Sequence, residues 1–253
     1  MRRLLAAITL SLLAWAVLAG PQEVRKAADQ GYAPAQGILG MRYYAGQGVP
    51  QDYVEALKWY RKAAAQGIPM VQFNLGLMYA TGQGVPQDDA EALKWYRKAA
   101  DQGYAPAQAG LGFMYRHGHG VPQDYVEALK WSRKAADQGD PTAQFNIGGM
   151  YEFGKGVRQD YAEAVKWCRK AADQGYAPAQ AALGLTYRNG HGVPQDYVEA
   201  HKWSNLAAAR AADKDMRESA TALRDDVAGM MTPAQVAEAQ KLAREWKPTP
   251  PVK

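Results

Sequence analysis

The fold is decided by a unit of sequence that residues 105–140 show in full, where the chain reads APAQAGLGFMYRHGHGVPQDYVEALKWSRKAADQGD. The unit recurs at intervals of 36 residues. Its second half carries a tryptophan in every copy, at Trp59, Trp95, Trp131, Trp167 and Trp203. Its first half carries a glycine and a tyrosine at the same interval, at Gly40, Gly76, Gly112, Gly148 and Gly184 and at Tyr43, Tyr79, Tyr115, Tyr151 and Tyr187. A fixed period of this length indicates stacked repeats, each in contact with its neighbours.

Each repeat is predicted to form two helices, as the second copy illustrates. Apolar residues at helical spacing predict a first helix over residues 71–81, with Gly76 where another backbone comes close. Residues 82–86 read GQGVP, and their glycines and proline end this helix and lead into a second one over residues 88–102. Neither helix can bury its apolar stripe alone, so neighbouring hairpins must stack, and the predicted fold class is all-α.

An aspartate marks the start of every second helix, and a glutamate follows it three residues later. The pairs are Asp52 and Glu55, Asp88 and Glu91, Asp124 and Glu127, Asp160 and Glu163, and Asp196 and Glu199. This spacing predicts a capping box, in which each side chain accepts a hydrogen bond from the backbone N–H of the other residue. Arg61 and Lys62 lie near the end of the same helix, where cations favour the helix dipole, so their role is interpreted as structural.

Five repeats are predicted, at residues 33–68, 69–104, 105–140, 141–176 and 177–212. Residues 20–32 match the end of a second helix, with Glu23 at the tryptophan position, and are predicted to form an N-terminal capping half-repeat. Residues 213–246 are predicted to form a C-terminal helical cap of two helices, the second capped by Thr232 and Gln235. Residues 247–253 contain three prolines and are expected to be a disordered tail.

Residues 1–19 are predicted to be a cleaved secretory signal peptide. Arg2 and Arg3 precede an apolar run that ends at the small residues Ala19 and Gly20. The run is shorter than the ~20 residues of a membrane-spanning helix, so an uncleaved anchor is the weaker interpretation and no stable membrane insertion is expected after cleavage. The expected location of the mature protein is therefore periplasmic or secreted.

Charge and cysteine content exclude several other classes of protein. Of the 30 basic and 25 acidic residues, only Arg2 and Arg3 fall within residues 1–19, which leaves a net charge of +3 without them. Basic and acidic residues recur side by side in each repeat, so no nucleic-acid partner is expected. Cys168 is the single cysteine, so no disulfide can form within the chain and packing must hold the fold.

The repeat resembles the Sel1-like repeat, a relative of the tetratricopeptide repeat with a longer loop. The resemblance is carried by Ala107, Gln108, Leu111, Gly112, Tyr115, Gly118, Gly120, Asp124, Ala128, Trp131, Ala135, Ala136 and Gly139, and by their equivalents in the other copies. It implies an α/α right-handed superhelical solenoid with a concave inner face that serves as an adaptor for protein complexes. In exported bacterial members, it implies a role in envelope signalling, surface organisation or contact with a host.

Residues that vary between copies on one helical face are the candidate partner-binding residues. All four phenylalanines, Phe73, Phe113, Phe145 and Phe153, lie at variable positions of the first helix. By analogy with the tetratricopeptide groove, the proposed contacts to a protein or peptide partner are Phe73, Asn74, Phe113, Arg116, Phe145, Asn146 and Arg188. Asparagines suit a peptide backbone and arginines suit carboxylates. The other interpretation, which stays open, is that the phenylalanines fill gaps between repeats.

Motifs for catalysis are weak, so the expected protein is a non-enzymatic scaffold with no catalytic residues, no metal and no cofactor. His119 and His191 occupy equivalent loop positions two repeats apart, too far to share one metal ion. Cys168 has no histidine at a recurring position nearby to act as a base.

The expected partner is an envelope protein. Two alternatives are a cell-wall-related enzyme or receptor that binds a β-lactam or peptidoglycan fragment, and a secreted host-interaction factor.

Overall fold

The computed structural model describes residues 20–250, and every regular element in this range is a helix. The all-α prediction of repeated helical hairpins is therefore confirmed. The predicted signal peptide, residues 1–19, and the last residues of the predicted tail, 251–253, lie outside the described residues. No helix within the described range is long and apolar enough to cross a membrane.

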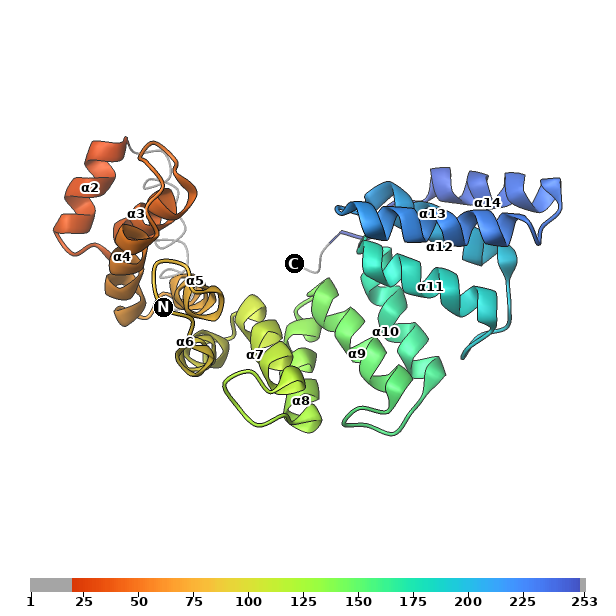
Figure 1. Cartoon of the computed structure of the whole chain (residues 1–253), viewed down its shortest axis with the longest axis horizontal. Coiled ribbons are helices and arrows are strands. Elements are labelled where there is room, and N and C mark those ends of the chain that lie inside the picture. Colours follow the sequence, from red (N-terminus) through yellow and green to blue (C-terminus); the bar gives the residue numbers. More distant parts are fainter. Residues whose placement is uncertain (1–19, 251–253) are drawn as a thin grey trace, which may run out of the picture. The chain divides into compact units, whose positions relative to one another are not determined.

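The chain divides into two compact units, Met1–Gln123 and Asp124–Lys253. The helices of the first unit are α2 (Pro21–Asp29), α3 (Ala33–Ala45), α4 (Tyr53–Ala65), α5 (Pro69–Thr81), α6 (Asp89–Asp101) and α7 (Ala105–His117). Those of the second are α8 (Tyr125–Asp137), α9 (Pro141–Phe153), α10 (Tyr161–Asp173), α11 (Ala177–Asn189), α12 (Tyr197–Arg210), α13 (Lys214–Ala228) and α14 (Pro233–Glu245). Consecutive helices pack side by side from α2 to α7 in the first unit and from α8 to α13 in the second, as Figure 1 shows for α3 with α4 and for α11 with α12.

Local signals set the helix ends close to where the sequence predicts them. Helix α5 begins with Pro69 in its first turn, where the missing N–H costs nothing, two residues before the predicted start. It ends at Gly82, whose φ of 69° lies in the left-handed region and lets its N–H donate to the carbonyl of Met78. The same glycine geometry ends α3, α7, α9 and α11, so the hairpin turn has one design throughout.

The predicted capping box of the second helices is correct in one half and wrong in the other. Asp52 accepts hydrogen bonds from the N–H groups of Val54 and Glu55, at 2.9 and 3.0 Å, as predicted. The N–H of Asp52, however, donates to the carbonyl of Tyr43 at 2.9 Å, on the preceding helix. Glu55 instead pairs with Lys58 at 3.1 Å. The backbone of the hairpin loop therefore takes over the bond that the glutamate was predicted to make. In α14, Thr232 and Gln235 do form both halves of a capping box.

The repeat tryptophans differ in burial although their positions are equivalent. Trp59, Trp131 and Trp203 expose 1%, 3% and 1% of their surface, whereas Trp95 and Trp167 are half-buried. A lysine lies 4.0 Å from the ring centroid of each half-buried indole, Lys98 on Trp95 and Lys170 on Trp167. The prediction that the indoles form the core is thus correct for three copies. In the other two, part of the ring meets solvent. The lysine over the ring does not distinguish these copies, because Lys134 also lies 4.0 Å from the ring centroid of the buried Trp131.

A ladder of buried glutamines joins successive hairpins. In every repeat the Nε2 of one glutamine donates to a carbonyl eight residues earlier, at 3.1 to 3.3 Å; the pairs are Gln36 to Ala28, Gln72 to Ala64, Gln108 to Ala100, Gln144 to Ala136 and Gln180 to Ala172. Gln66, Gln102 and Gln174 donate in turn to the Oε1 atoms of Gln36, Gln72 and Gln144. The buried amides of Gln36, Gln72 and Gln144 therefore have partners on both sides, as a buried polar group requires, whereas the Oε1 of Gln180 has no hydrogen-bond partner.

Arginines of the second helices make a further link to the next repeat. Arg61 donates to the hydroxyl of Tyr79 at 2.6 Å, and the same bond joins Arg25 to Tyr43, Arg97 to Tyr115, Arg133 to Tyr151 and Arg169 to Tyr187. The structural interpretation of Arg61 is therefore supported, but its partner is a neighbouring repeat as well as the helix dipole. The bond also explains why the tyrosine recurs.

Helices α13 and α14 follow the last repeat. Both lie within residues 213–246, the range predicted for the two C-terminal helices. Helix α13 packs on α12 and α11, and α14 packs on α12. Trp246, directly after α14, lies edge-on to Trp203 with ring centroids 6.4 Å apart. Beyond it, the N–H of Thr249 donates to the carbonyl of Asp173 at 2.7 Å, so this part of the predicted tail contacts the fold.

His201 is a buried histidine at the position where earlier copies carry Leu57, Leu93 and Leu129, and it gives a testable pH dependence. Burial lowers its pKa, and the neighbouring Arg224 lowers it further while Asp225 opposes this. The pKa of His201 is therefore lower in the folded protein than in the unfolded one. The stability contributed by the neutral His201 side chain is present above about pH 6.5 and is lost as the pH falls through the folded pKa.

We therefore expect the His201→Leu variant to lose less stability than the wild type between pH 7 and pH 5. Urea unfolding at each pH measures this. Equal slopes of unfolding free energy against pH in the two proteins would contradict the expectation.

Candidate protein-binding surface

The seven predicted contact residues are divided between the two units. Phe73 and Asn74 lie on α5 and Phe113 and Arg116 on α7, in the first unit, whereas Phe145, Asn146 and Arg188 lie on α9 and α11, in the second. Because the predicted groove draws residues from both units, it stays a prediction.

Phe73 and Asn74 are both engaged within their own unit. The ring of Phe73 stacks on Tyr96 with centroids 5.2 Å apart and meets Tyr104 edge-on at 5.8 Å. Asn74 hydrogen-bonds the hydroxyl of Tyr60, whose pKa burial raises to about 12. Both side chains are half-buried. Their contacts fit the gap-filling interpretation of the phenylalanines better than the partner-binding one.

The candidates of the second unit are likewise engaged in packing. Phe145 packs against the core cluster that contains Leu183 and Trp203, and its ring lies 5.7 Å from that of Tyr176. Arg188 forms an ion pair with Asp226 of α13 at 2.7 Å. Asn146, which follows Phe145 on α9, is half-buried. The partner of Arg188 could not be predicted from the repeats, because α13 lies outside the repeat register.

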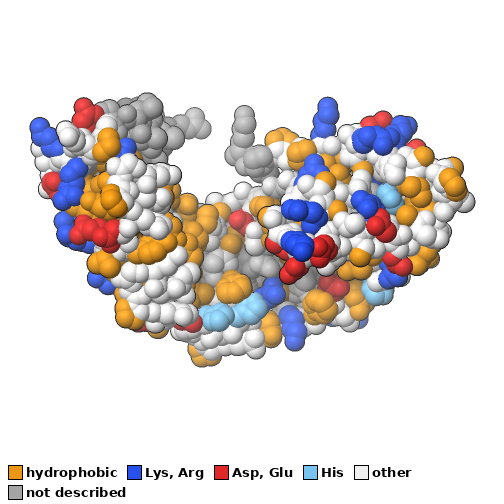
Figure 2. All heavy atoms as spheres, turned by 45° about the horizontal axis from the view of Figure 1, so that its top comes forward, with side chains coloured by type: hydrophobic (Ala, Val, Ile, Leu, Met, Phe, Trp, Pro, Cys, Tyr) orange, Lys and Arg blue, Asp and Glu red, His pale blue; other side chains and the backbone are white. Residues whose placement is uncertain are grey.

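Phe113 differs from the other candidates because half of its surface, 50%, is exposed. Its ring lies 4.4 Å from that of His117 and stacks on His119 at 5.6 Å with an angle of 6° between the planes. Asp89 holds His119 through a 3.3 Å contact to Nδ1. Together with the half-buried Arg116, these residues form what we call the Phe113 cluster: Phe113, Arg116, His117 and His119. Figure 2 shows histidine side chains at the surface beside hydrophobic ones.

Leu185 of the second unit occupies the same repeat position as Phe113 and is 47% exposed. The other copies carry Met41, Leu77 and Gly149 there, none of them buried. Two positions earlier in the helix, Leu75, Leu111 and Leu183 are fully buried. The position of Phe113 is therefore variable, apolar and open to solvent. Leu185 was not among the predicted contacts, although the sequence shows that the residue at this repeat position differs between copies.

The residues considered for metal binding or catalysis are the loop histidines and Cys168. Within residues 20–250, no three His, Cys, Asp or Glu side chains gather in a way that would hold a metal ion. The Cys168 thiol is buried, and burial followed by the charge of Glu152 raises its pKa to about 12. A thiol with so high a pKa is protonated at neutral pH, so it is a poor nucleophile.

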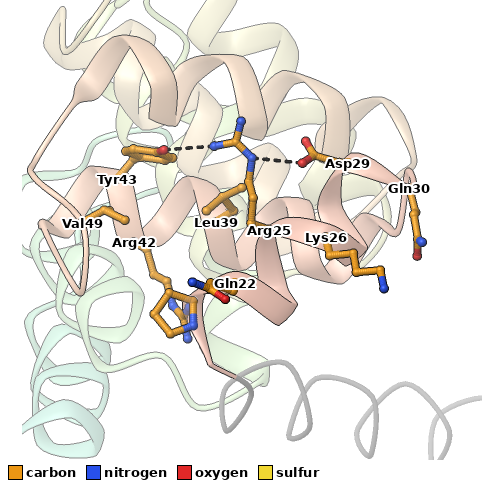
Figure 3. A pocket seen from close by; sticks show the side chains of 10 residues that line it. Gln22, Arg25, Lys26, Asp29, Gln30, Leu39, Arg42, Tyr43 and Val49 are labelled. Atoms are coloured by element: carbon orange, nitrogen blue, oxygen red, sulfur yellow. Dashed lines mark hydrogen bonds and ion pairs between the residues drawn. The ribbon is translucent and has the colours of Figure 1, made fainter.

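A pocket of about 560 Å³ lies between α2 and α3, and Figure 3 shows its side chains. Arg25 lies at its centre and donates to Asp29 at 3.2 Å and to the hydroxyl of Tyr43 at 3.3 Å. The guanidinium of Arg25 also lies 5.3 Å from the ring centroid of Trp59. The central cation of this pocket is thus part of the packing of the first half-repeat on its neighbour.

The arrangement defines a class, the helical-hairpin repeat proteins, in which each hairpin is bonded to the next by the same side chains. The Sel1 repeat model matches this chain at residues 33–68, 69–104, 105–140, 141–176 and 177–211. The chain belongs to the Sel1 repeat family, whose repeats are typically non-catalytic protein-binding units. No match was found among curated protein sequences.

Solved structures of bacterial Sel1 repeat proteins resemble this chain. A protective antigen present in uropathogenic Escherichia coli strains is 40% identical with a TM-score of 0.74, and the match covers 88% of this chain and 48% of the antigen. The present chain thus spans about half the length of that protein. A Sel1 repeat protein from Oxalobacter formigenes is 36% identical with a TM-score of 0.72, covering 85% and 88% of the two chains. The family resemblance seen in the sequence is confirmed.

Proposed function

We propose that this protein is a non-enzymatic adaptor that binds a partner protein in the bacterial cell envelope, and that the Phe113 cluster is a principal contact. The observation that carries the proposal is the half-exposed ring of Phe113 at a position where the copies differ, whereas two positions earlier every copy has a buried leucine or isoleucine. Packing explains these buried residues, whereas the exposed half of the Phe113 side chain gains nothing from the repeat stack. Aromatic and arginine side chains are the residues that dominate protein interfaces.

The envelope location rests on the first 19 residues, whose basic start and apolar run are typical of an export signal. The family supports the adaptor role, because Sel1 repeats usually bind proteins. Cys168 and His191 line one pocket, but the raised pKa of the Cys168 thiol makes it a poor nucleophile, so the proposal gives these residues no catalytic role. The proposed partner is therefore an envelope protein that presents a surface complementary to an aromatic and cationic cluster.

A pair of variants tests the role of the Phe113 cluster. Phe113→Ala should reduce capture of partner proteins about tenfold, because loss of a buried aromatic anchor costs roughly 1–2 kcal/mol of binding energy. Val54→Ala is the matched control, since Val54 is also apolar and 65% exposed in the same unit but lies on a second helix. The measurement is quantitative mass spectrometry after crosslinking in intact cells, with helicity checked by circular dichroism.

Phe113 is the better probe than Phe73 or Phe145, since the latter two pack against Tyr96 and Tyr176 and their loss would also weaken the fold. If Phe113→Ala and Val54→Ala capture the same proteins in the same amounts as the wild type, the Phe113 cluster is not the contact.

A further inference from the structure

A pocket of about 280 Å³ opens in the second unit, between α10 and α11. Its floor is apolar and consists of Ala164, Val165 and Cys168 on α10 and Ala182 on α11. Its rim carries Glu152 at the end of α9 and His191 in the loop after α11. All of its lining residues belong to this unit, so its shape does not depend on the other one.

The pocket exists because Cys168 is small where the first two repeats have a tyrosine. On the side of the preceding helix the three residues are alike, since a Cβ added to Gly40, Gly76 or Gly148 would lie 2.5, 2.7 or 2.6 Å from Tyr60, Tyr96 or Cys168. The difference lies on the side of the next helix, which only a tyrosine ring is long enough to reach. The ring of Tyr96 also extends to Gly110 of the next repeat, at 3.4 Å from an added Cβ. Ala182 is the equivalent of Gly110, and Cys168 is too short to reach across, so the space between α10 and α11 stays open.

The charge at the rim is a carboxylate that the fold leaves available. Glu152 forms no ion pair within residues 20–250. The nearby Lys155 points instead to the ring of Tyr125, 5.2 Å from its centroid. The negative charge of Glu152 reaches the floor of the pocket, since it contributes to the raised pKa of Cys168. A negative charge above an apolar floor complements a positive charge at the end of an apolar stem.

The remaining walls suit the same shape of ligand. The rings of Tyr161 and His191 lie 5.6 Å apart beside the rim, and Tyr161 is 43% exposed. An aromatic face attracts an ammonium or guanidinium group. A volume of about 280 Å³ is at the lower limit of small-molecule sites, so it fits one long side chain better than a cofactor. Lysine and arginine bury their methylene stems on apolar surface while the charged group stays at the rim.

We propose that this pocket receives a lysine or arginine side chain of the partner protein, with its stem against Val165 and Leu185 and its charged group at Glu152. The inference rests on the proposed function, because it assumes a protein partner. Leu185 connects the two, since it lines the pocket and also occupies the exposed repeat position of Phe113. The pocket would then supply charge specificity to an otherwise apolar contact.

A peptide-display experiment tests this inference with a defined probe. A library of random 12-residue peptides is selected on the full chain, with the Cys168→Tyr variant used to remove peptides that bind elsewhere. Cys168→Tyr restores the residue of the first two repeats and should fill the pocket without unfolding the protein, which the thermal midpoint verifies. We expect the recovered peptides to share a lysine or arginine and to lose at least tenfold in affinity for Glu152→Gln. Glu238→Gln removes the same charge from an exposed site on α14 and should have no effect.

The inference is overturned if no peptide is recovered, if the recovered peptides lack a common basic residue, or if they bind Glu152→Gln as tightly as the wild type. The proposed function can be judged separately by protein capture in cells. If Phe113→Ala abolishes capture while Glu152→Gln and Cys168→Tyr leave it intact, the adaptor role stands and the pocket has no part in it.

Discussion

Replacing Trp59 by alanine is expected to lower the free energy of unfolding by ~3–5 kcal/mol, the usual cost of deleting a large buried aromatic side chain. Trp59 exposes only 1% of its surface and packs in the cluster of Val24, Ile38 and Leu39. Arg25 and Lys62 lie on its ring, so its loss also removes the partner of two cations. Urea unfolding followed by circular dichroism measures the change.

Trp95→Ala is the matched control, because Trp95 occupies the same repeat position in the same unit but is half-buried. It should cost clearly less than Trp59→Ala, since its ring already meets solvent. Equal losses for the two variants would show that burial of the indole does not determine its contribution.

The second large effect is expected at Gly84, in the loop between α5 and α6. A Cβ at this position would lie 2.5 Å from the carbonyl oxygen of Tyr53 in the preceding repeat, and the φ of 70° is unfavourable for any side chain. We expect Gly84→Ala to cost roughly 2–5 kcal/mol, of which the left-handed backbone accounts for about 1–2 and the clash for the rest.

Gly82→Ala separates these two causes. Gly82 has nearly the same φ, 69°, but its added Cβ would meet nothing closer than 3.5 Å. This variant should therefore lose only the roughly 1–2 kcal/mol of the left-handed backbone. If the two variants unfold at the same urea concentration, the loop does not press on the preceding repeat as the structure indicates.

The sequence predicts the helices well because the signals that start and end them are local. The aspartate caps and the left-handed glycines act on the backbone within a few residues, so their 36-residue recurrence determines every hairpin. The glutamine ladder could not be predicted from such local signals, because Gln72 and Ala64 belong to different repeats. Only the packing of the two repeats shows that Gln72 donates a hydrogen bond to Ala64. The missing half of the capping box has the same origin, since the competing carbonyl of Tyr43 lies on another helix.

The candidate site could be predicted only in part, for a similar reason. Variation between copies correctly points to exposed positions such as Phe113, but it does not distinguish exposure from gap filling, as Phe73 shows. Arg188 was unpredictable because Asp226 comes from α13, which has no counterpart in the repeats. The replacement of tyrosine by Cys168 is visible in the sequence, yet the pocket it leaves depends on Ala182 across the interface.

The central claim is that each hairpin buries its apolar side only on its neighbours, so that a whole repeat is the unit of the fold. Deleting residues 69–104 removes one repeat and joins equivalent positions of the first and third. The account predicts that this variant keeps its helicity per residue and unfolds cooperatively at a lower urea concentration, whereas deletion of residues 69–86, half a repeat, loses helical structure. Circular dichroism of the two variants across a urea titration is the direct test. Equal loss of helical signal in both would contradict the account, because it would show that the repeats share a core that does not tolerate the removal of one.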